Sequence, residues 1–418
     1  MTKRLILAFV FLSWHLVACS NGDSGISSGL PDKPSAEEDS PGTETISEEM
    51  RVKITGEDLY ISAKLDAKTD ILYWFKKCMF NELFTFYRVG TIDNNMPTPA
   101  TLPDASPTSL LNLAYSDNIG PFNITGYGWC GGNHPYLDEV TQTARNIGYR
   151  IYIDGKEIKT DLSTLTKEIK IEVINEIMNP SKADTSSGKT LLNEILCIET
   201  VNYSIYRNNI QVLVTHEFQN ESPVTVQMYY GMQSMFDKET HTLTANGKYV
   251  DWTVQKDVST FTKKEYPSFR RFIEKSANAY QSSYLFADGL GNHEQISDDD
   301  IIFIGNSTNK TYHKIIADRE HKKGDIIHWS GVYTWFKSPV SDDDDLLCYE
   351  GVIDNKKVLF IDCKKSVDRT IQLPVDYTKK SFTIIEKSKS ITITGNKVTA
   401  KGLKIVSDGS GSCVITFD

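Results

Sequence analysis

The chain has 418 residues, with 45 Lys and Arg against 55 Asp and Glu and a formal net charge of −10 at pH 7. This acidic balance argues against a nucleic-acid partner, because contacts to phosphate need clustered Lys and Arg. The length leaves room for two or three folded domains of ordinary size. The 20 Tyr, 18 Phe and 6 Trp lie largely in alternating runs, which favours a mainly β fold.

The first residues have the features of a secretory signal. Two basic residues, Lys3 and Arg4, precede an apolar run over residues 5–17. This run is shorter than the roughly 20 residues of a membrane-spanning helix. Residues 16–19 have the sequence LVAC, which resembles a bacterial lipobox and implies cleavage before Cys19 and lipidation of that residue. An ordinary secretory signal that ends in Cys is the alternative.

A polar segment follows the signal peptide of residues 1–18. Residues 19–50 are rich in Ser, Gly, Pro, Asp and Glu and contain no aromatic residue, which predicts a disordered tether. The tract SNGD at residues 20–23 resembles the surface-export signals of Bacteroides-type lipoproteins. We therefore expect a cell-envelope protein in the outer membrane, with its periplasmic or surface face left open.

The remainder is expected to form a large antiparallel β-sandwich or supersandwich over residues 51–290 and a β-rich domain over residues 291–418. The second domain is expected to add a smaller β-sandwich layer. The Asp154-Gly155 pair predicts a tight hairpin turn. Apolar alternation predicts long strands over residues 150–153, 167–174, 194–206, 209–217 and 224–232.

One helix is expected, over residues 269–285, because Phe272, Ile273, Ala277 and Tyr280 form an apolar stripe. Short strands are predicted again from residue 301 to the C-terminus. The Asp runs at 298–300 and 342–345 lack an EF-hand ligand pattern, so solvated acidic loops are expected there and no metal site.

Six cysteines follow Cys19, and none forms a close Cys-x-x-Cys pair. A buried thiol is expected for Cys197. Cys348 and Cys363 are candidates to face each other across neighbouring strands, and the pairing of the six is left open because 15 connectivities exist. The other three are Cys78, Cys130 and Cys413.

The densest chemical cluster is residues 126–136, with the sequence GYGWCGGNHPY. A neutral His is a general base near neutral pH, and an Asn amide can steady an oxyanion, so Asn133 and His134 are candidate catalytic residues. Trp129 and Tyr136 are candidate binding residues, since an aromatic ring face matches the C–H face of a sugar. A buried structural turn is the alternative for the whole segment.

The long strands supply further candidates. Val212, Val214 and His216 are expected on one sheet face, and His216 is a candidate binding residue. Gln227 and Tyr229 are expected on one face of the next strand and Tyr230 on the other. We take Tyr229 as a catalytic candidate and Gln227 and Tyr230 as binding candidates. The alternative for each is a structural role, which is the commoner one for a strand His or for packed Tyr.

Long antiparallel strands with His, Tyr and Gln on one face, followed by a smaller β-domain, resemble the β-supersandwich regions of polysaccharide lyases and mutarotase-like proteins. The resemblance implies carbohydrate binding. The lyases use Asn and Arg at the uronate and His or Tyr to move protons, and Asn133, His134, Tyr229 and Arg207 match these residues in type. The helical toroid that precedes the sheet in many such lyases is missing from the sequence.

Three hypotheses follow, and none needs a cofactor. The first is a lipid-anchored protein that binds a glycan or polysaccharide and uses Cys19 to reach the membrane. The second is a polysaccharide lyase or other glycan-cleaving enzyme. The third is a structural or adhesion lipoprotein. No Gly-x-x-x-x-Gly-Lys-Ser/Thr or His-Glu-x-x-His motif is present, which counts against a nucleotide enzyme and a zincin.

Overall fold

The computed structural model describes residues 46–101, 109–113, 119–236, 239–244, 247–252, 254, 259–261, 270–277, 279–296, 302–305 and 310–418. The expected signal peptide, Cys19, most of the tether and the acidic run 298–300 lie outside these residues. The described part is mainly β, as predicted. It contains no helix long and apolar enough to cross a membrane.

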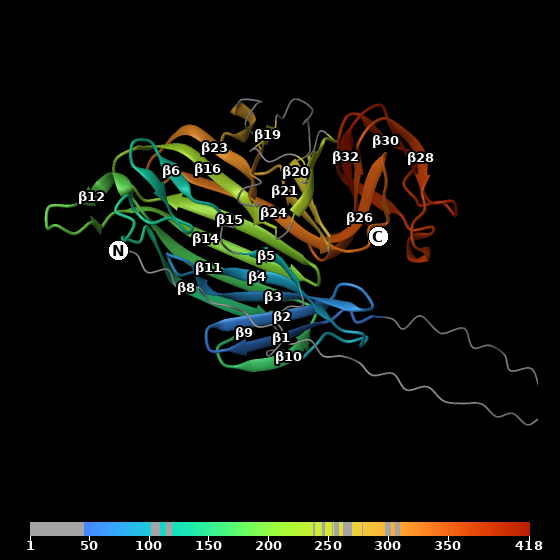
Figure 1. Ribbon diagram of the computed structural model, residues 1–418, viewed down its shortest axis with the longest axis horizontal. Helices are drawn as coiled ribbons and strands as arrows, with labels where there is room; N and C mark the ends of the chain where they lie inside the picture. Colours follow the sequence, from blue (N-terminus) through green and yellow to red (C-terminus); the bar gives the residue numbers. More distant parts are fainter. Residues whose placement is uncertain are drawn as a thin grey trace, which may run out of the picture. The chain divides into compact units, whose positions relative to one another are not determined.

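Three sheets build the main sandwich (Figure 1). The N-terminal sheet has the order β10-β1-β2-β3-β4-β5, the large sheet β18-β17-β20-β21-β24-β15-β14-β11-β8-β9, and the middle sheet β19-β22-β23-β16-β6-β7. The strands of the N-terminal sheet are β1 Met50–Thr55, β2 Asp58–Lys64, β3 Thr69–Cys78, β4 Leu83–Asp93, β5 Ser109–Leu113 and β10 Leu162–Thr166. Those of the large sheet are β8 Ala144–Ile153, β9 Lys156–Ile158, β11 Ile169–Met178, β14 Ile195–Tyr206, β15 Asn209–Phe218, β17 Glu239–Thr244, β18 Tyr249–Asp251, β20 Arg270–Ser276, β21 Tyr280–Leu285 and β24 Ile326–Phe336. Those of the middle sheet are β6 Phe122–Ile124, β7 Gly128–Cys130, β16 Val224–Met235, β19 Ser259–Phe261, β22 Ile302–Gly305 and β23 Lys310–His321.

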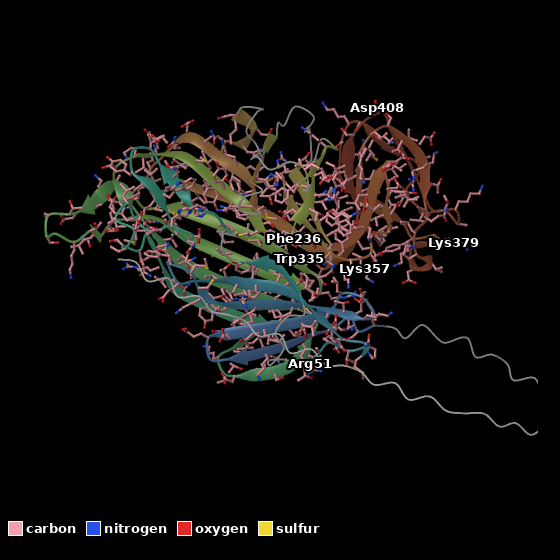
Figure 2. The ribbon with its side chains drawn as sticks, viewed as in Figure 1. Arg51, Phe236, Trp335, Lys357, Lys379 and Asp408 are labelled. Atoms are coloured by element: carbon pink, nitrogen blue, oxygen red, sulfur yellow. The ribbon has the colours of Figure 1, made fainter. Side chains whose placement is uncertain are left out.

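The C-terminal strands form a smaller sandwich of a five-stranded sheet, β25-β26-β27-β32-β29, and a three-stranded sheet, β28-β31-β30. These strands are β25 Ser341–Asp342, β26 Leu346–Ile353, β27 Lys356–Cys363, β28 Val367–Ile371, β29 Phe382–Lys387, β30 Ile391–Ile393, β31 Leu403–Ser407 and β32 Gly411–Phe417. A separate hairpin pairs β12 Ala183–Asp184 with β13 Leu191–Leu192. Short 3-10 turns occur at Pro180–Lys182, His293–Gln295 and Val375–Tyr377. Figure 2 shows the side chains on this scaffold, with Arg51 on β1 and Asp408 among the last strands.

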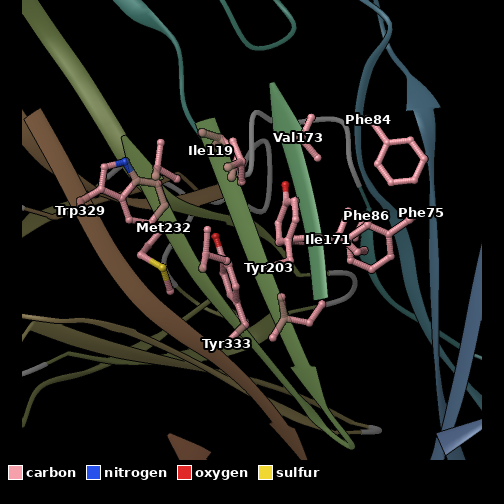
Figure 3. Packing of buried hydrophobic residues seen from close by; sticks show 14 of the residues in the cluster. Phe75, Phe84, Phe86, Ile119, Ile171, Val173, Tyr203, Met232, Trp329 and Tyr333 are labelled. Atoms are coloured by element: carbon pink, nitrogen blue, oxygen red, sulfur yellow. The ribbon is translucent and has the colours of Figure 1, made fainter. Parts of the chain in front are cut away.

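The N-terminal and middle sheets pack against the same face of the large sheet. From the N-terminal sheet, Phe75 meets Tyr203 of β14 at 5.4 Å between ring centroids, and Phe86 meets Tyr333 of β24 at 5.6 Å. From the middle sheet, Met232 joins the same cluster (Figure 3). A single large core therefore fills the space between the large sheet and two smaller ones, as in a supersandwich.

The helix predicted for residues 269–285 is wrong. The segment forms β20 and β21, which pair as an antiparallel hairpin from Arg270↔Leu285 to Lys275↔Tyr280. Every residue of β21 is buried, because both faces of this part of the large sheet are covered. A strand covered on both faces loses its polar alternation, and its apolar residues then mimic a helical stripe.

Strands on both sides of residue 290, where we predicted a domain boundary, belong to the same sheets. β23 and β24 complete the middle and large sheets, and the pairing moves to the C-terminal sheets only at Ser341. The two parts also share a hydrophobic cluster, in which Tyr284 and Val332 of the large sheet meet Phe360 of β27. The division at 290 stays a prediction.

The six cysteines after Cys19 are buried and free. Cys348 lies opposite Ile361, and Cys363 lies opposite Leu346, so these thiols are on neighbouring strands without directly facing each other. The acidic run 342–345 is neutralised in part, since Asp342 is 3.0 Å from both Lys275 Nζ and Lys364 Nζ. No group of three His, Cys, Asp or Glu among the described residues is placed to hold a metal ion.

Candidate functional site

The glycine-rich segment forms a hairpin, β6–β7, and a loop that crosses the large sheet. Gly131 and Gly132 have φ values of 78° and 48°, in the left-handed region that other residues adopt at a cost. A Cβ on Gly131 would lie 3.3 Å from Ile177 Cγ2 of β11. Glycine therefore lets this loop pack directly on the large sheet.

Three of the candidate residues from the sequence come together at this loop. The ring of Trp129 stacks with His134 at 5.2 Å and with Tyr230 at 6.0 Å, and Tyr230 meets Tyr312 of β23 at 3.9 Å. We call these four residues the ring cluster. Trp129 and His134 are half-buried, whereas Tyr230 and Tyr312 are buried. Burial raises the pKa of Tyr230 to about 12, so its hydroxyl is neutral.

Three apolar side chains close in sequence to Trp129 and His134 are exposed. Tyr127 is 42% exposed, Leu137 67% and Val140 76%. A Cβ on Gly128 would lie 3.0 Å from Leu137 Cδ2, so Leu137 rests on the hairpin that carries Trp129. The loop thus presents aromatic and aliphatic groups to solvent on one short segment, which is unusual for a plain surface turn.

Tyr229 and His216 lie in the core, away from the ring cluster. The Tyr229 hydroxyl donates to the Ile119 carbonyl at 3.0 Å and accepts from Trp329 Nε1 at 2.7 Å. Burial raises the pKa of Tyr229 well above its ordinary value. His216 shares an inward face with Val212 and Val214, as predicted, and its Nε2 is 2.9 Å from Glu199 Oε2.

A small cavity, which we call the loop pocket, lies beneath the glycine loop. Its volume is about 40 Å³, and its lining includes Thr85, Asn133, Asn175, Glu199 and Tyr203. The buried Glu199 carboxylate accepts from Asn175 Nδ2 at 2.9 Å on one oxygen and contacts His216 through the other. A cavity of this size holds a few water molecules and no sugar unit.

Asn133 and His134 have structural contacts in this loop. The Asn133 side-chain oxygen accepts from the Phe80 backbone N–H at 2.6 Å. The His134 carbonyl accepts from Asn81 Nδ2 at 3.2 Å and from the Thr143 hydroxyl. These bonds fix the loop to the β3–β4 turn and to Thr143, which directly precedes β8. Tyr136 is half-buried in the same loop, where its N–H donates to the Thr141 carbonyl.

Arg207 and Gln227 are not brought to the loop. Arg207 occupies the β14–β15 turn with φ 49°, and its guanidinium pairs with Glu48 at 3.0 Å. Gln227 is exposed while Tyr229 is buried, so the expectation that they share a face is wrong. The register of β16 shifts between Val226 and Met228, and such a bulge reverses the alternation of side chains.

Sequence reasoning missed Glu199, Asn175 and Tyr312. A signal was present for Glu199, because the alternation of residues 195–206 places it on the same inward face as Cys197, Val201 and Tyr203. A carboxylate at a core position needs partners. Nothing in the sequence indicated that Asn175 would be one of them, since it lies on a different strand.

No family model matches the chain, and no curated protein matches it. Solved structures with weak similarity include a GH36 alpha-galactosidase, AgaB, from Geobacillus stearothermophilus, with a TM-score of 0.39, 10% identity and coverage of 69% of this chain and 41% of that one. A polysaccharide lyase has a TM-score of 0.23, 9% identity and coverage of 73% and 43%. Chondroitin AC lyase from Streptomyces coelicolor A3 has a TM-score of 0.19, 8% identity and coverage of 87% and 49%.

The resemblance to polysaccharide lyases expected from the sequence is thus matched by weak structural similarity to two such enzymes. The chain spans less than half the length of each of these structures. At these scores the likeness assigns no activity and no ligand to this chain. The function has to be argued from its own residues.

Proposed function

We propose that this protein binds carbohydrate at the ring cluster and the surrounding loop. The observation that supports this most directly is the half-exposed Trp129 and His134 pair, stacked at 5.2 Å, on the same glycine-rich segment as the 42% exposed Tyr127. Part-exposed rings offer an apolar surface to the C–H groups of a sugar, and their polar edges accept or donate hydrogen bonds. This loop is fixed by bonds to the β3–β4 turn and to Thr143, which lowers the entropic cost of binding.

The geometry supports binding over catalysis. A lyase of the expected kind would need His134, Tyr229 and Arg207 near one reacting centre. Tyr229 is buried behind Trp329, and Arg207 is bonded to Glu48 and to the Lys64 carbonyl. Glu199, which contacts His216, lines a cavity of about 40 Å³, which is too small to admit a sugar. The described residues therefore do not assemble that active site.

We also propose that the protein is anchored in the cell envelope through lipid on Cys19. The LVAC sequence at residues 16–19 and the polar segment that follows support this proposal. An anchored protein on a tether would meet polysaccharides of the envelope or its surroundings.

The test is a glycan array followed by titration with the uncharged glycans that bind. Trp129→Ala should lower the affinity about tenfold or more, the loss expected when about 1.4 kcal/mol of ring contact is removed. Tyr152→Ala is the control, since Tyr152 is a half-buried ring on β8 away from the loop. An absorbance assay for unsaturated uronate products should show no turnover. Absence of binding on the whole panel, or equal affinity of a folded Trp129→Ala variant, would disprove the proposal.

A further inference from the structure

The outward face of the N-terminal sheet carries a row of cationic and aromatic side chains. Pairing places Lys53 opposite Tyr60, Tyr60 opposite Trp74, and Trp74 opposite Arg88. All four are half-buried and alternate with core residues of their strands. With strands about 4.8 Å apart, the row extends about 14 Å across β1, β2, β3 and β4.

A β-bulge adds a second aromatic residue to this face. Trp74 pairs with Arg88 and the next residue, Phe75, pairs with Phe86, so Tyr87 is the extra residue on β4. The bulge turns both Tyr87 and Arg88 outward, whereas Phe86 remains in the core. Lys76 also faces outward from β3. We call Lys53, Tyr60, Trp74, Lys76, Tyr87 and Arg88 the outer row.

The rings and cations of the outer row are in mutual contact. Trp74 stacks on Tyr60 at 5.3 Å and meets Tyr87 edge-on at 5.0 Å. Lys76 Nζ lies 4.4 Å from the Trp74 centroid and 4.2 Å from the Tyr87 centroid. Arg88 Cζ lies 4.8 Å from the Tyr87 centroid. Trp74 Nε1 donates to Asp58 at 2.9 Å, which fixes the indole. These contacts preorganise the side chains on a rigid sheet.

The three cations of the outer row have no carboxylate partner within 4.0 Å among the described residues. Of the two nearby acids, Asp58 accepts from Trp74 of the row and Glu57 pairs with Lys77 at 3.2 Å, so neither forms an ion pair with these three cations. On the outer face of the large sheet, by contrast, Arg145 and Arg150 each pair with a glutamate. In a chain of net charge −10, three neighbouring cations without ion pairs among the described residues are a local exception that attracts anions.

We propose that the outer row binds an acidic polysaccharide, a chain of sugar units that carry carboxylate or sulfate groups. The end cations Lys53 and Arg88 pair with acidic groups about 14 Å apart, and the rings of Tyr60 and Trp74 between them contact the sugar skeleton. This arrangement matches a polymer in which apolar C–H surface separates the charges. The rings of the outer row are half-buried and none is among the exposed large hydrophobic side chains, which disfavours insertion into a lipid surface. This surface is independent of the ring cluster, which lies on the middle sheet.

The experiment titrates the full-length protein with polygalacturonate and chondroitin sulfate, and with dextran as the neutral polymer. The acidic polymers should bind, dextran should not bind at the outer row, and added salt should weaken the affinity. The double variant Lys76→Ala/Arg88→Ala and the single variant Trp74→Ala should each lose about tenfold or more in affinity. Lys389→Ala/Lys401→Ala removes the same charge from exposed sites of the C-terminal sandwich and should bind normally.

The outcomes separate this proposal from the one for the ring cluster. Trp129→Ala should leave the affinity for the acidic polymers unchanged. A lower affinity of this variant would mean that the acidic polymers bind at the loop. Equal binding of wild type and the Lys76→Ala/Arg88→Ala variant, with both folded by circular dichroism, overturns the outer row as the site. Binding of a DNA duplex or of phosphatidylglycerol vesicles as tight as that of the acidic polymers overturns the assignment to a polysaccharide.

Discussion

Glu274 should make the stability of the protein depend on pH in a direction opposite to that of most carboxylates. Its side chain is fully buried on β20 and accepts from the Ser234 hydroxyl at 2.6 Å and the Thr311 hydroxyl at 2.5 Å. Burial raises its pKa from 4.5 to about 7. Between these values the folded state holds a proton that the unfolded state has released, so the free energy of unfolding falls as the pH rises through this window.

The magnitude follows from the size of the shift. A difference of about 2.5 pKa units at 1.36 kcal/mol each corresponds to about 3 kcal/mol of stability lost between pH 4.5 and pH 7. Glu274→Gln removes the titration and keeps the shape. The free energy of unfolding of this variant, relative to wild type, should therefore improve by about 3 kcal/mol between pH 5 and pH 8.

Urea unfolding at both pH values measures this difference, and the comparison with the variant is essential. His321 is also buried, and burial lowers its pKa to about 4. Its contribution is present above pH 6.5 and is lost as the pH falls toward 4, which opposes that of Glu274 in the wild-type profile. Glu217→Gln, at an exposed position of β15, is the control and should follow wild type. If the difference in the free energy of unfolding between wild type and Glu274→Gln is the same at pH 5 and pH 8, the reasoning is refuted.

Three further outcomes are expected. Gly120→Ala should lower the free energy of unfolding in urea by more than about 3 kcal/mol, because its Cβ would lie 1.6 Å from the Tyr230 carbonyl at φ +111°. Gly126→Ala, with free space around it, should cost only about 1–2 kcal/mol. Similar losses for the two variants would contradict this reasoning. The six buried thiols should resist alkylation at pH 8 in the folded protein and react fully after denaturation, as counted by mass spectrometry, and a disulfide that survives denaturation would be contrary evidence. Cys19→Ala should abolish incorporation of labelled fatty acid and move the protein from the detergent phase to the aqueous phase, and unchanged partitioning would exclude the proposed anchor.

The strands that alternate cleanly were predictable from the sequence. The turn at Asp154-Gly155 joins β8 to β9 as expected, with both residues at positive φ. His216 lies on the inward face with Val214, as predicted, because the alternation of apolar and polar residues shows which side chains of a strand with one covered face point inward. The strands predicted between residues 150 and 232 are confirmed for the same reason.

The failures have two physical causes. β20 and β21 were predicted as a helix because layers on both sides removed their polar face. Bulges in β16 and β4 separated Gln227 from Tyr229 and turned Tyr87 outward, and a bulge leaves no reliable mark in a single sequence. The candidate site was only partly predictable, since Trp129, His134 and Tyr230 meet through pairings of distant strands.

The order of strands in the large sheet has a consequence for how the protein is made. β15 pairs with β24, although the two strands are far apart in the sequence. For example, Thr334 of β24 bonds to Asn209 of β15, 125 residues earlier. During synthesis, one edge of β15 therefore stays open until β24 emerges. Closing such a long loop is slow, and an open apolar strand edge is a template for pairing with other chains. Folding yield should depend on how quickly residues 326–336 arrive, and on any chaperone that covers the β15 edge in the meantime.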